Sequence, residues 1–302
     1  MANNSKHISR MVEAMKNWDI VPSGKVEAPS GVFGRKVIIK SGDVKIDSDE
    51  LDCEFSVPFD DNTEPNEAEI TVYNLTQTTI KKLKNDQTIS ITAGYGKDTG
   101  VIFSGRISKV KTKYVGVDKQ TTIYAVDSES RKDMDIEAVT YGSQAKASTI
   151  LKHLVLRLKL PIAVFKVRYD KVFESPVTIS GSLNSNIENY ANICGVSVYI
   201  NKGMVYVRQV SKGSDINFTV SEETGLIDTP EEFEEEHERE SGEETITETT
   251  KGYKLKMLLQ HRITVGVTIT LKSRNANGRF TVREGSHSFD GTNFTTEITV
   301  VS

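Results

Sequence analysis

The sequence is poor in the residues that crosslink small secreted folds or cross membranes. Only two of its 302 residues are cysteines, Cys53 and Cys194, and they are far apart in the chain. We therefore expect two buried free thiols rather than a disulfide, and no Cys-x-x-Cys metal site. No apolar run approaches the roughly 18 to 20 residues that span a bilayer, and the N-terminal residues lack the apolar core of a signal peptide. These absences predict a protein made in a cytoplasm, without membrane insertion by this chain.

Nucleotide-binding motifs are also missing, although one short stretch is rich in glycine. The stretch ITAGYGKDTGVIFSGRIS contains Gly94, Gly96, Gly100 and Gly105. A Walker A loop needs Ser or Thr after Gly-Lys, and here an aspartate follows. A dinucleotide fingerprint needs a helix after its glycines, whereas a strand pattern follows here. We expect no cofactor, and we expect the residues from Gly96 to Gly100 to turn one strand back onto the next.

Catalytic signatures are equally scarce. The five histidines include no His-Glu-x-x-His pair, and no Gly-x-Ser-x-Gly elbow is present. Ser286, His287 and Asp290 are close in sequence, but alternate residues of a strand point to opposite faces and do not easily converge as a triad. We expect His287 to be a polar residue at a strand end or barrel seam. The acids around His237 suit a solvated face better than a cation site, and no carboxylate pair is singled out among the 42 acids. We predict no catalytic and no metal-binding residues.

Charge is distributed unevenly along the chain. The formal net charge is −4, which does not indicate a nucleic-acid-binding protein. Residues 221–250 contain 13 acids and one arginine, a net charge of −12, so the other 272 residues carry +8. This composition predicts a solvated, mobile loop, and a charged tether or a lumen-facing insertion is the alternative.

A second charged segment has the opposite sign. Basic residues recur along RISKVKTKYVGVDK, at Arg106, Lys109, Lys111 and Lys113. Lysines blunt an exposed strand edge against aggregation, and they also suit a contact with another subunit or partner. Specific DNA binding is less favoured because aromatic stacking platforms are absent.

Hydrophobic periodicity divides the chain into four parts. Residues 1–34 predict an amphipathic helix at 6–18 followed by a linker. In residues 35–130 apolar side chains alternate with period two, which predicts an antiparallel β-barrel. One short helix, capped by Thr76, interrupts this barrel. Residues 131–212 predict an α+β domain, with helices at 143–160 and 183–194 and a hairpin that turns at residues 201–203. Residues 213–302 predict a second barrel, interrupted by the acidic loop 221–250.

The two β regions resemble each other. ITAGY, Gly-Arg and Thr-Thr of the first region recur as ITVGV, Gly-Arg and Thr-Thr in the second, in the same order and at nearly equal spacing. This similarity equates Gly94 with Gly266, and Gly105 with Gly278. We therefore predict two copies of one barrel, so that three chains would form a ring of six similar barrels.

Four segments carry a further pattern: AEITVYNLTQTTIKKLK, GYGKDTGVIFSGRI, SNIENYANICGVSVYINKGMVYV and GRFTVREGSHSFDGTNFTTEITV. Together they resemble the baseplate hub proteins of phage tails and phage-tail-like particles. The resemblance implies a homotrimer with two tube-like barrels per chain. The ring would adapt a hexameric tail tube, or its initiator protein, to a trimeric spike or tail-tip protein. The tape measure protein and DNA would pass through it as cargo, and baseplate wedge proteins would surround it.

The resemblance leaves several points open. It implies a location in a virion or tail-like particle, and it does not distinguish a contractile injection system or DNA-free tailocin from an infectious phage. The acidic segment 221–250 has no counterpart in the family pattern. Two other functions are kept as alternatives: a distal-tail or tube protein with one barrel and six-fold symmetry, and a tail-associated cell-wall hydrolase.

Overall fold

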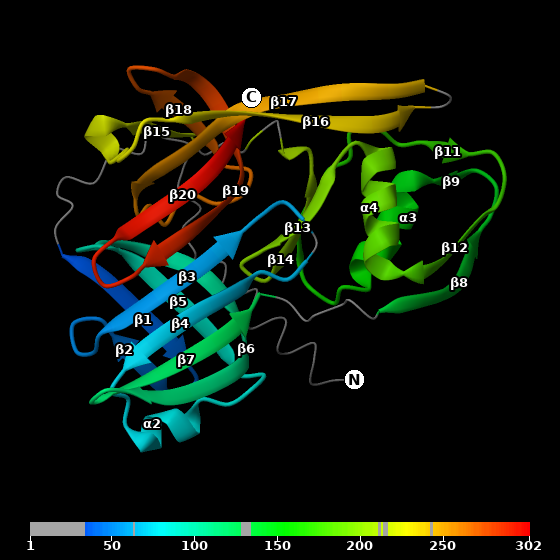
Figure 1. The fold of residues 1–302 in the computed structure, drawn as a ribbon. Coiled ribbons are helices and arrows are strands. Elements are labelled where there is room, and N and C mark those ends of the chain that lie inside the picture. The colour runs from blue at the N-terminus through cyan, green and yellow to red at the C-terminus, as the bar shows by residue number, and fades with distance from the viewer. Residues whose placement is uncertain (1–33, 63, 128–133, 211–212, 214–216, 242–243) are drawn as a thin grey trace.

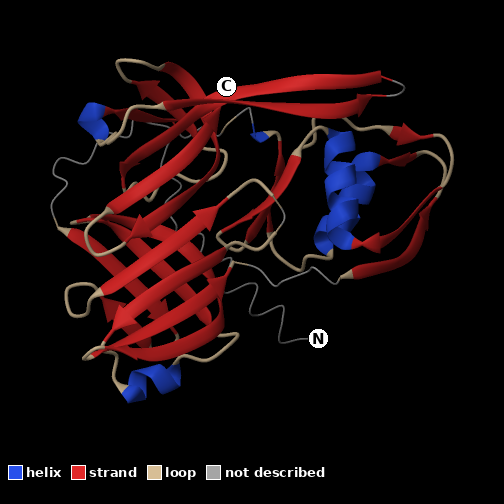
Figure 2. Cartoon of the chain, in the orientation of Figure 1, coloured by secondary structure: helices blue, strands red, loops and turns tan. Residues whose placement is uncertain are grey.

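The computed structural model describes residues 34–62, 64–127, 134–210, 213, 217–241 and 244–302. Strands dominate these residues, and the helices are few (Figure 2). Three hydrophobic cores organise the fold: one in each of two β-rich halves, and one in an α+β insert between them in sequence. The mainly β fold with an α+β insert is thus confirmed. The helix expected at residues 6–18 lies outside the described residues.

The first half is a curled antiparallel sheet at the blue end of the chain (Figure 1). Its apolar residues alternate inward, so that Ile70, Ile91 and Ile123 are fully buried. The short helix α2 (Gln77–Lys82) begins at Thr76, whose hydroxyl accepts a hydrogen bond from the Thr79 N–H. The strands are β1 (Arg35–Ser41), β2 (Val44–Asp47), β3 (Cys53–Phe59), β4 (Glu67–Tyr73), β5 (Thr88–Tyr95), β6 (Asp98–Val115) and β7 (Asp118–Val126).

The insert packs two helices against short strands. The second helix, α4 (Leu183–Cys194), ends at Gly195 in the left-handed conformation, as the sequence predicts. The first, α3 (Ala147–Leu156), is shorter than the expected 143–160, because β9 occupies the residues before it and Gln144 takes a positive φ. The strands are β8 (Asp135–Tyr141), β9 (Ala145–Lys146), β10 (Ile162–Phe165), β11 (Val172–Phe173), β12 (Val177–Ser182), β13 (Ser197–Asn201) and β14 (Met204–Arg208).

The second half repeats the antiparallel arrangement. Its strands are β15 (Asn217–Ser221), β16 (Glu231–Ser241), β17 (Glu244–Leu258), β18 (Thr268–Lys272), β19 (Asn277–Phe289) and β20 (Phe294–Val301), with the short helix η2 (Glu222–Thr224) after β15. The pair formed by β15 and β18 is parallel. The two halves are joined edge to edge, because β3 pairs with β19 and makes one continuous sheet of 13 strands.

The two halves share one strand register. The order β4-β7-β6-β5 in the first half matches β17-β20-β19-β18 in the second. In the β6–β7 pair, Arg106 lies opposite Val126 and a bulge follows Ile107; in the β19–β20 pair, Thr281 lies opposite Val301 and a bulge follows Val282. Adding 175 to each residue of the first hairpin gives its counterpart in the second. The two β regions are therefore copies of one meander.

The glycine equivalences expected from the sequence are wrong. The register places Phe280, not Gly278, at the position of Gly105, because the sequence match was shifted by two residues. Gly266 lies in a turn before β18, whereas Gly94 lies within β5, so these two are not counterparts either. Short Gly-Arg and Thr-rich matches identified the correct region but not the correct register.

The prediction of a mobile acidic loop at 221–250 is also wrong, because most of this segment forms a β-hairpin. Strand β16 pairs with β17 along its whole length, and β17 pairs in turn with β20. Phe233, Ile246 and several threonines, which favour strands, lie among the acids of this segment. The charge is offset in part by basic neighbours, since Lys251 contacts Glu234 at 2.9 Å and Arg283 contacts Glu235 at 2.6 Å.

Candidate assembly surfaces

The glycine-rich stretch lies where the first half contacts the second. The turn is Gly96-Lys97, shorter than the expected Gly96 to Gly100, and β6 begins at once with Asp98. The carboxylate of Asp98 accepts two hydrogen bonds from the guanidinium of Arg262, one of them at 2.9 Å. This ion pair lowers the pKa of Asp98. The stretch therefore joins the two halves of the chain.

Gly100 and Gly105 permit close approaches that a side chain would block. A Cβ atom at Gly100 would overlap the imidazole of His261, and one at Gly105 would overlap the carbonyl of Val126. Burial lowers the pKa of His261 to about 4, with a smaller contribution from Arg262. A neutral imidazole thus packs directly on the β6 backbone. Gly266 has a comparable role elsewhere, since the Arg208 guanidinium lies beside it and donates to its carbonyl at 2.9 Å.

The seam between the halves buries His287. Its side chain is 1% exposed, lies on β19 opposite Val57 of β3, and packs 5.0 Å from the ring of Phe59. Nδ1 lies 2.8 Å from the hydroxyl of Thr296. Burial lowers the pKa of His287 to about 3. A polar residue at the seam is what the sequence suggested for His287.

Ser286, His287 and Asp290 do not form a catalytic triad. The Asp290 carboxylate caps the β19–β20 turn, where it accepts hydrogen bonds from the backbone of Thr292 and Asn293. His287 bonds to Thr296 on the other strand of the hairpin. The neighbouring Ser286 and Asp290 are not among its hydrogen-bond partners within the described residues.

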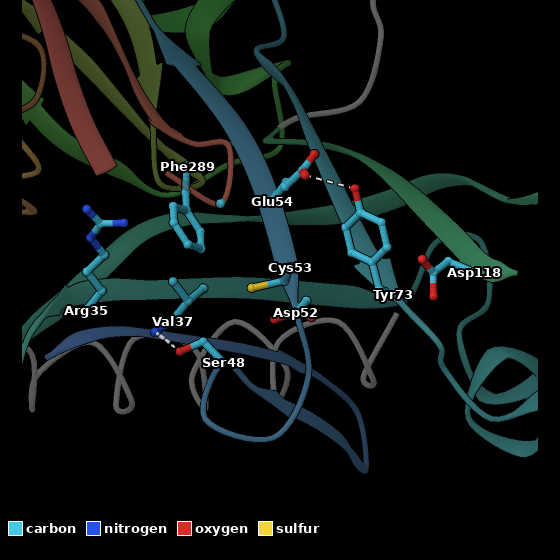
Figure 3. Close-up of a pocket in the computed structure, with 10 residues that line it drawn as sticks. Arg35, Val37, Ser48, Asp52, Cys53, Glu54, Tyr73, Asp118 and Phe289 are labelled. Atoms are coloured by element: carbon cyan, nitrogen blue, oxygen red, sulfur yellow. Dashed lines mark hydrogen bonds between the residues drawn. The ribbon is translucent and has the colours of Figure 1, made fainter. Parts of the chain in front are cut away.

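A surface depression of about 530 Å³ opens at one end of the seam (Figure 3). Two of its polar side chains already have partners: the Tyr73 hydroxyl donates to Glu54 at 2.8 Å, and the Ser48 hydroxyl accepts from the Val37 N–H at 2.9 Å. Burial raises the pKa of the Cys53 thiol to about 12, so this cysteine is not an activated nucleophile. The lining thus offers no converging set of catalytic groups.

The basic side chains of β6 share one face. The bulge after Ile107 reverses the alternation of the strand, which places Arg106 on the same side as Lys109, Lys111 and Lys113. All four are exposed, and the Lys111 ammonium lies 5.4 Å from the centre of the Tyr124 ring. We call residues 109–115 the basic edge. Strand β5 pairs with β6 only as far as Arg106, so in the described chain this edge has β7 on one side and no strand on the other.

One end of the 13-stranded sheet is acidic. Strand β16 is the first strand in the sheet order and has β17 as its neighbour (Figure 1). Glu231, Glu232, Glu234 and Glu235 are exposed, and Phe233 is half-buried between them. We call residues 231–235 the acidic edge. The sheet therefore carries opposite charges at two edges that come from the two halves.

The described residues hold no cluster of three metal-ligating side chains. Within them no helix has the length and apolar character needed to cross a membrane.

Comparison with protein families gave one match over most of the chain. Residues 37–290 match the model of a family described as baseplate hub gp41. No curated protein matched the sequence.

Solved structures with a similar fold include two tail proteins and a component of a secretion system. A tail protein of Neisseria meningitidis has a TM-score of 0.62 at 8% identity, over 89% of this chain and 97% of the other. The 43 kDa tail protein of prophage MuSo2 from Shewanella oneidensis has a TM-score of 0.64 at 8% identity, with the same shares covered. The E. coli c3393 protein, a type VI secretion component described as similar to the T4 tail proteins gp27 and gp5, has a TM-score of 0.54 at 10% identity, over 87% of this chain and 76% of that one. At these identities the likeness is one of fold.

Proposed function

The chain belongs to the baseplate hub gp41 family, a family of phage-tail structural proteins, and from that premise we propose that it assembles as a homotrimer. The ring would join a hexameric tail tube, or its initiator, to a trimeric spike or tail-tip protein. Its channel would pass the tape measure protein and DNA, and wedge proteins would surround it in the particle. The chain would act by assembly alone and would have no catalytic role.

The duplicated meander is the observation that carries this proposal. Two copies of one strand pattern in one chain give three chains six similar halves. Such a ring can meet a six-fold tube on one side and a three-fold spike on the other. A distal-tail or tube protein with one barrel per chain would not need the second copy. A cell-wall hydrolase is disfavoured by the separate hydrogen bonds of His287 and Asp290.

Mass photometry of the purified chain, alone and with its tail tube protein, tests the proposal. The expected species has three times the monomer mass of 33.5 kDa. A chain that stays monomeric at every concentration, and also with the tube protein, would contradict the trimer. Hydrolysis of purified cell wall, lost on Glu or His substitution, would contradict the absence of catalysis.

A further inference from the structure

The seam inside one chain predicts the seam between chains. In the β3–β19 junction, Ser56 lies opposite Ser288 and Phe59 opposite Gly285. The shared register equates this part of β19 with Val110–Lys113 of β6, which belongs to the basic edge. In the second half, therefore, this edge is covered by a strand of the first half. In the first half the same edge has no strand of this chain upon it.

The strand that should cover the basic edge is also identified by register. Ser56 pairs with Glu69 in the first half, and Glu231 pairs with Lys254 at the matching position of the second. Strand β16 is thus the counterpart of β3. Where β3 has β19 at its outer edge, β16 has no strand within the described part of the chain. Each half supplies one member of a second junction and lacks the other.

We propose that the acidic edge of one copy pairs, antiparallel, with the basic edge of the next copy of this chain. This inference rests on the proposed trimer and gives it a register. Glu231 lies opposite Lys113, Glu232 opposite Thr112, Phe233 opposite Lys111 and Glu234 opposite Val110. In this pairing β16 of one copy runs antiparallel to β6 of the next copy, with the same residue register as β3 has on β19. The contact is head-to-tail, so copies close into a ring when the rotation between them allows it.

The side chains suit this register. On one face Lys113 and Lys111 meet Glu231 and the Phe233 ring, and opposite charges directly across a strand pair stabilise it. On the other face, the carboxylates of Glu232 and Glu234 already have partners on β17 of their own chain. Glu234 contacts Lys251 at 2.9 Å, and Glu232 accepts from the Tyr253 hydroxyl at 3.3 Å. A strand edge without a partner otherwise invites aggregation, and a neighbouring copy resolves that problem.

Disulfide trapping tests the register in the full chain. Thr112→Cys and Glu232→Cys are made as separate variants and mixed, so that a covalent dimer forms only between chains. Lys111→Cys with Phe233→Cys is the second pair. The Cα–Cα distance between opposed residues alternates between wide and narrow along an antiparallel strand pair. At least one of the two cysteine pairs, 112 with 232 or 111 with 233, therefore has the distance that a disulfide needs. The native cysteines are buried and do not compete.

Covalent dimers in the matched mixtures are the expected result. Mixing Thr112→Cys with Phe233→Cys places the thiols on opposite faces and should give none. Trimers that form without crosslinks in either matched mixture would overturn the junction and leave the trimer intact. A chain that never assembles, with or without tube protein, would contradict both the junction and the proposed function.

Charge exchange gives an independent readout. Reversal of the basic edge (Lys111→Glu, Lys113→Glu) should raise the concentration needed for half-assembly about tenfold or more. Adding Glu231→Lys should restore most of the loss. Lys81→Glu with Lys82→Glu on α2, where both lysines are exposed, is the matched control and should leave assembly unchanged. Equal effects of both double reversals, or no rescue, would overturn the pairing.

Discussion

Arg262 donates two hydrogen bonds to the carboxylate of Asp98, which lies 164 residues earlier in the chain. Both side chains are less than a third exposed. The pair connects the turn between β5 and β6 to the residues before β18, so it holds the two halves in position where their sheets meet.

Removal of this pair should destabilise the chain measurably. We expect Arg262→Ala to lower the free energy of unfolding by about 1–3 kcal/mol at pH 7, because a partly buried carboxylate loses a bidentate partner. Urea unfolding of Arg262→Ala, of Asp98→Ala and of the variant with both substitutions gives the coupling energy between the two side chains. Lys256→Ala removes the more exposed Lys256–Glu297 pair and should cost under about 1 kcal/mol. Equal losses for the two pairs would contradict a special role for Asp98.

The same pair predicts a pH dependence. The hydrogen bonds from Arg262 hold the pKa of Asp98 below its ordinary value of 3.8. The stabilisation is therefore present above that value and is lost as the pH falls through the lowered pKa. Asp98→Asn should flatten the acid limb of the stability curve, and an unchanged limb would contradict this.

Gly100→Ala tests the contact between β6 and His261. The added methyl would overlap the imidazole, so we expect a loss of about 1–3 kcal/mol in unfolding free energy. Combining it with His261→Ala should recover part of the loss. Gly142→Ala is the matched control, because nothing lies within 4 Å of its Cβ position. A neutral Gly100→Ala would show that the halves are not packed this closely.

Buried His287 predicts a second pH dependence, at higher pH. Its pKa is lowered to about 3 in the folded chain, whereas an unfolded histidine titrates near 6.5. The unfolded state therefore binds the proton first, and stability is complete above about pH 6.5 and falls as the pH drops toward 3. One such group changes the unfolding free energy by at most about 1.4 kcal/mol per pH unit. His287→Gln should reduce this slope between pH 6 and 4, while Thr296→Val should lower stability and keep the slope.

Hydrogen exchange tests whether the acidic segment is a strand pair. Residues Gly252–Lys254 are paired with β16 on one side and with β20 on the other. Their amides should therefore exchange much more slowly than those of β16, which has one neighbour. Unprotected exchange through Glu231–Glu235 of β16 would return the segment to the mobile loop that its composition suggested.

Period-two alternation and turn residues are enough to predict the strands of the first half and the β13–β14 hairpin, and helical spacing with Gly195 predicts α4, because each depends on local backbone preferences. The duplication was visible in sequence only as a similarity of region. Its register depends on bulges at Ser108 and Arg283, and no residue type marks a bulge reliably. The glycine pairs were therefore matched to the wrong positions.

The acidic hairpin and the seam could not be predicted for a different reason. The acidic composition of residues 221–250 indicates a loop when it is read without their partners. Strand β16 forms because it pairs with β17, and β17 is held in turn by β20, which is distant in sequence. The burial of His287 depends likewise on β3, more than two hundred residues earlier in the chain. The basic edge was recognised from its lysines, and its missing strand became evident only by comparison with β19.

An image of the chain bound to its tail tube by electron cryo-microscopy tests the central claim most directly. Three copies that present six similar halves around one channel, with β16 of each copy beside β6 of the next, are the predicted result. Six copies in a strict six-fold ring, or a single copy at the tube end, would contradict the account.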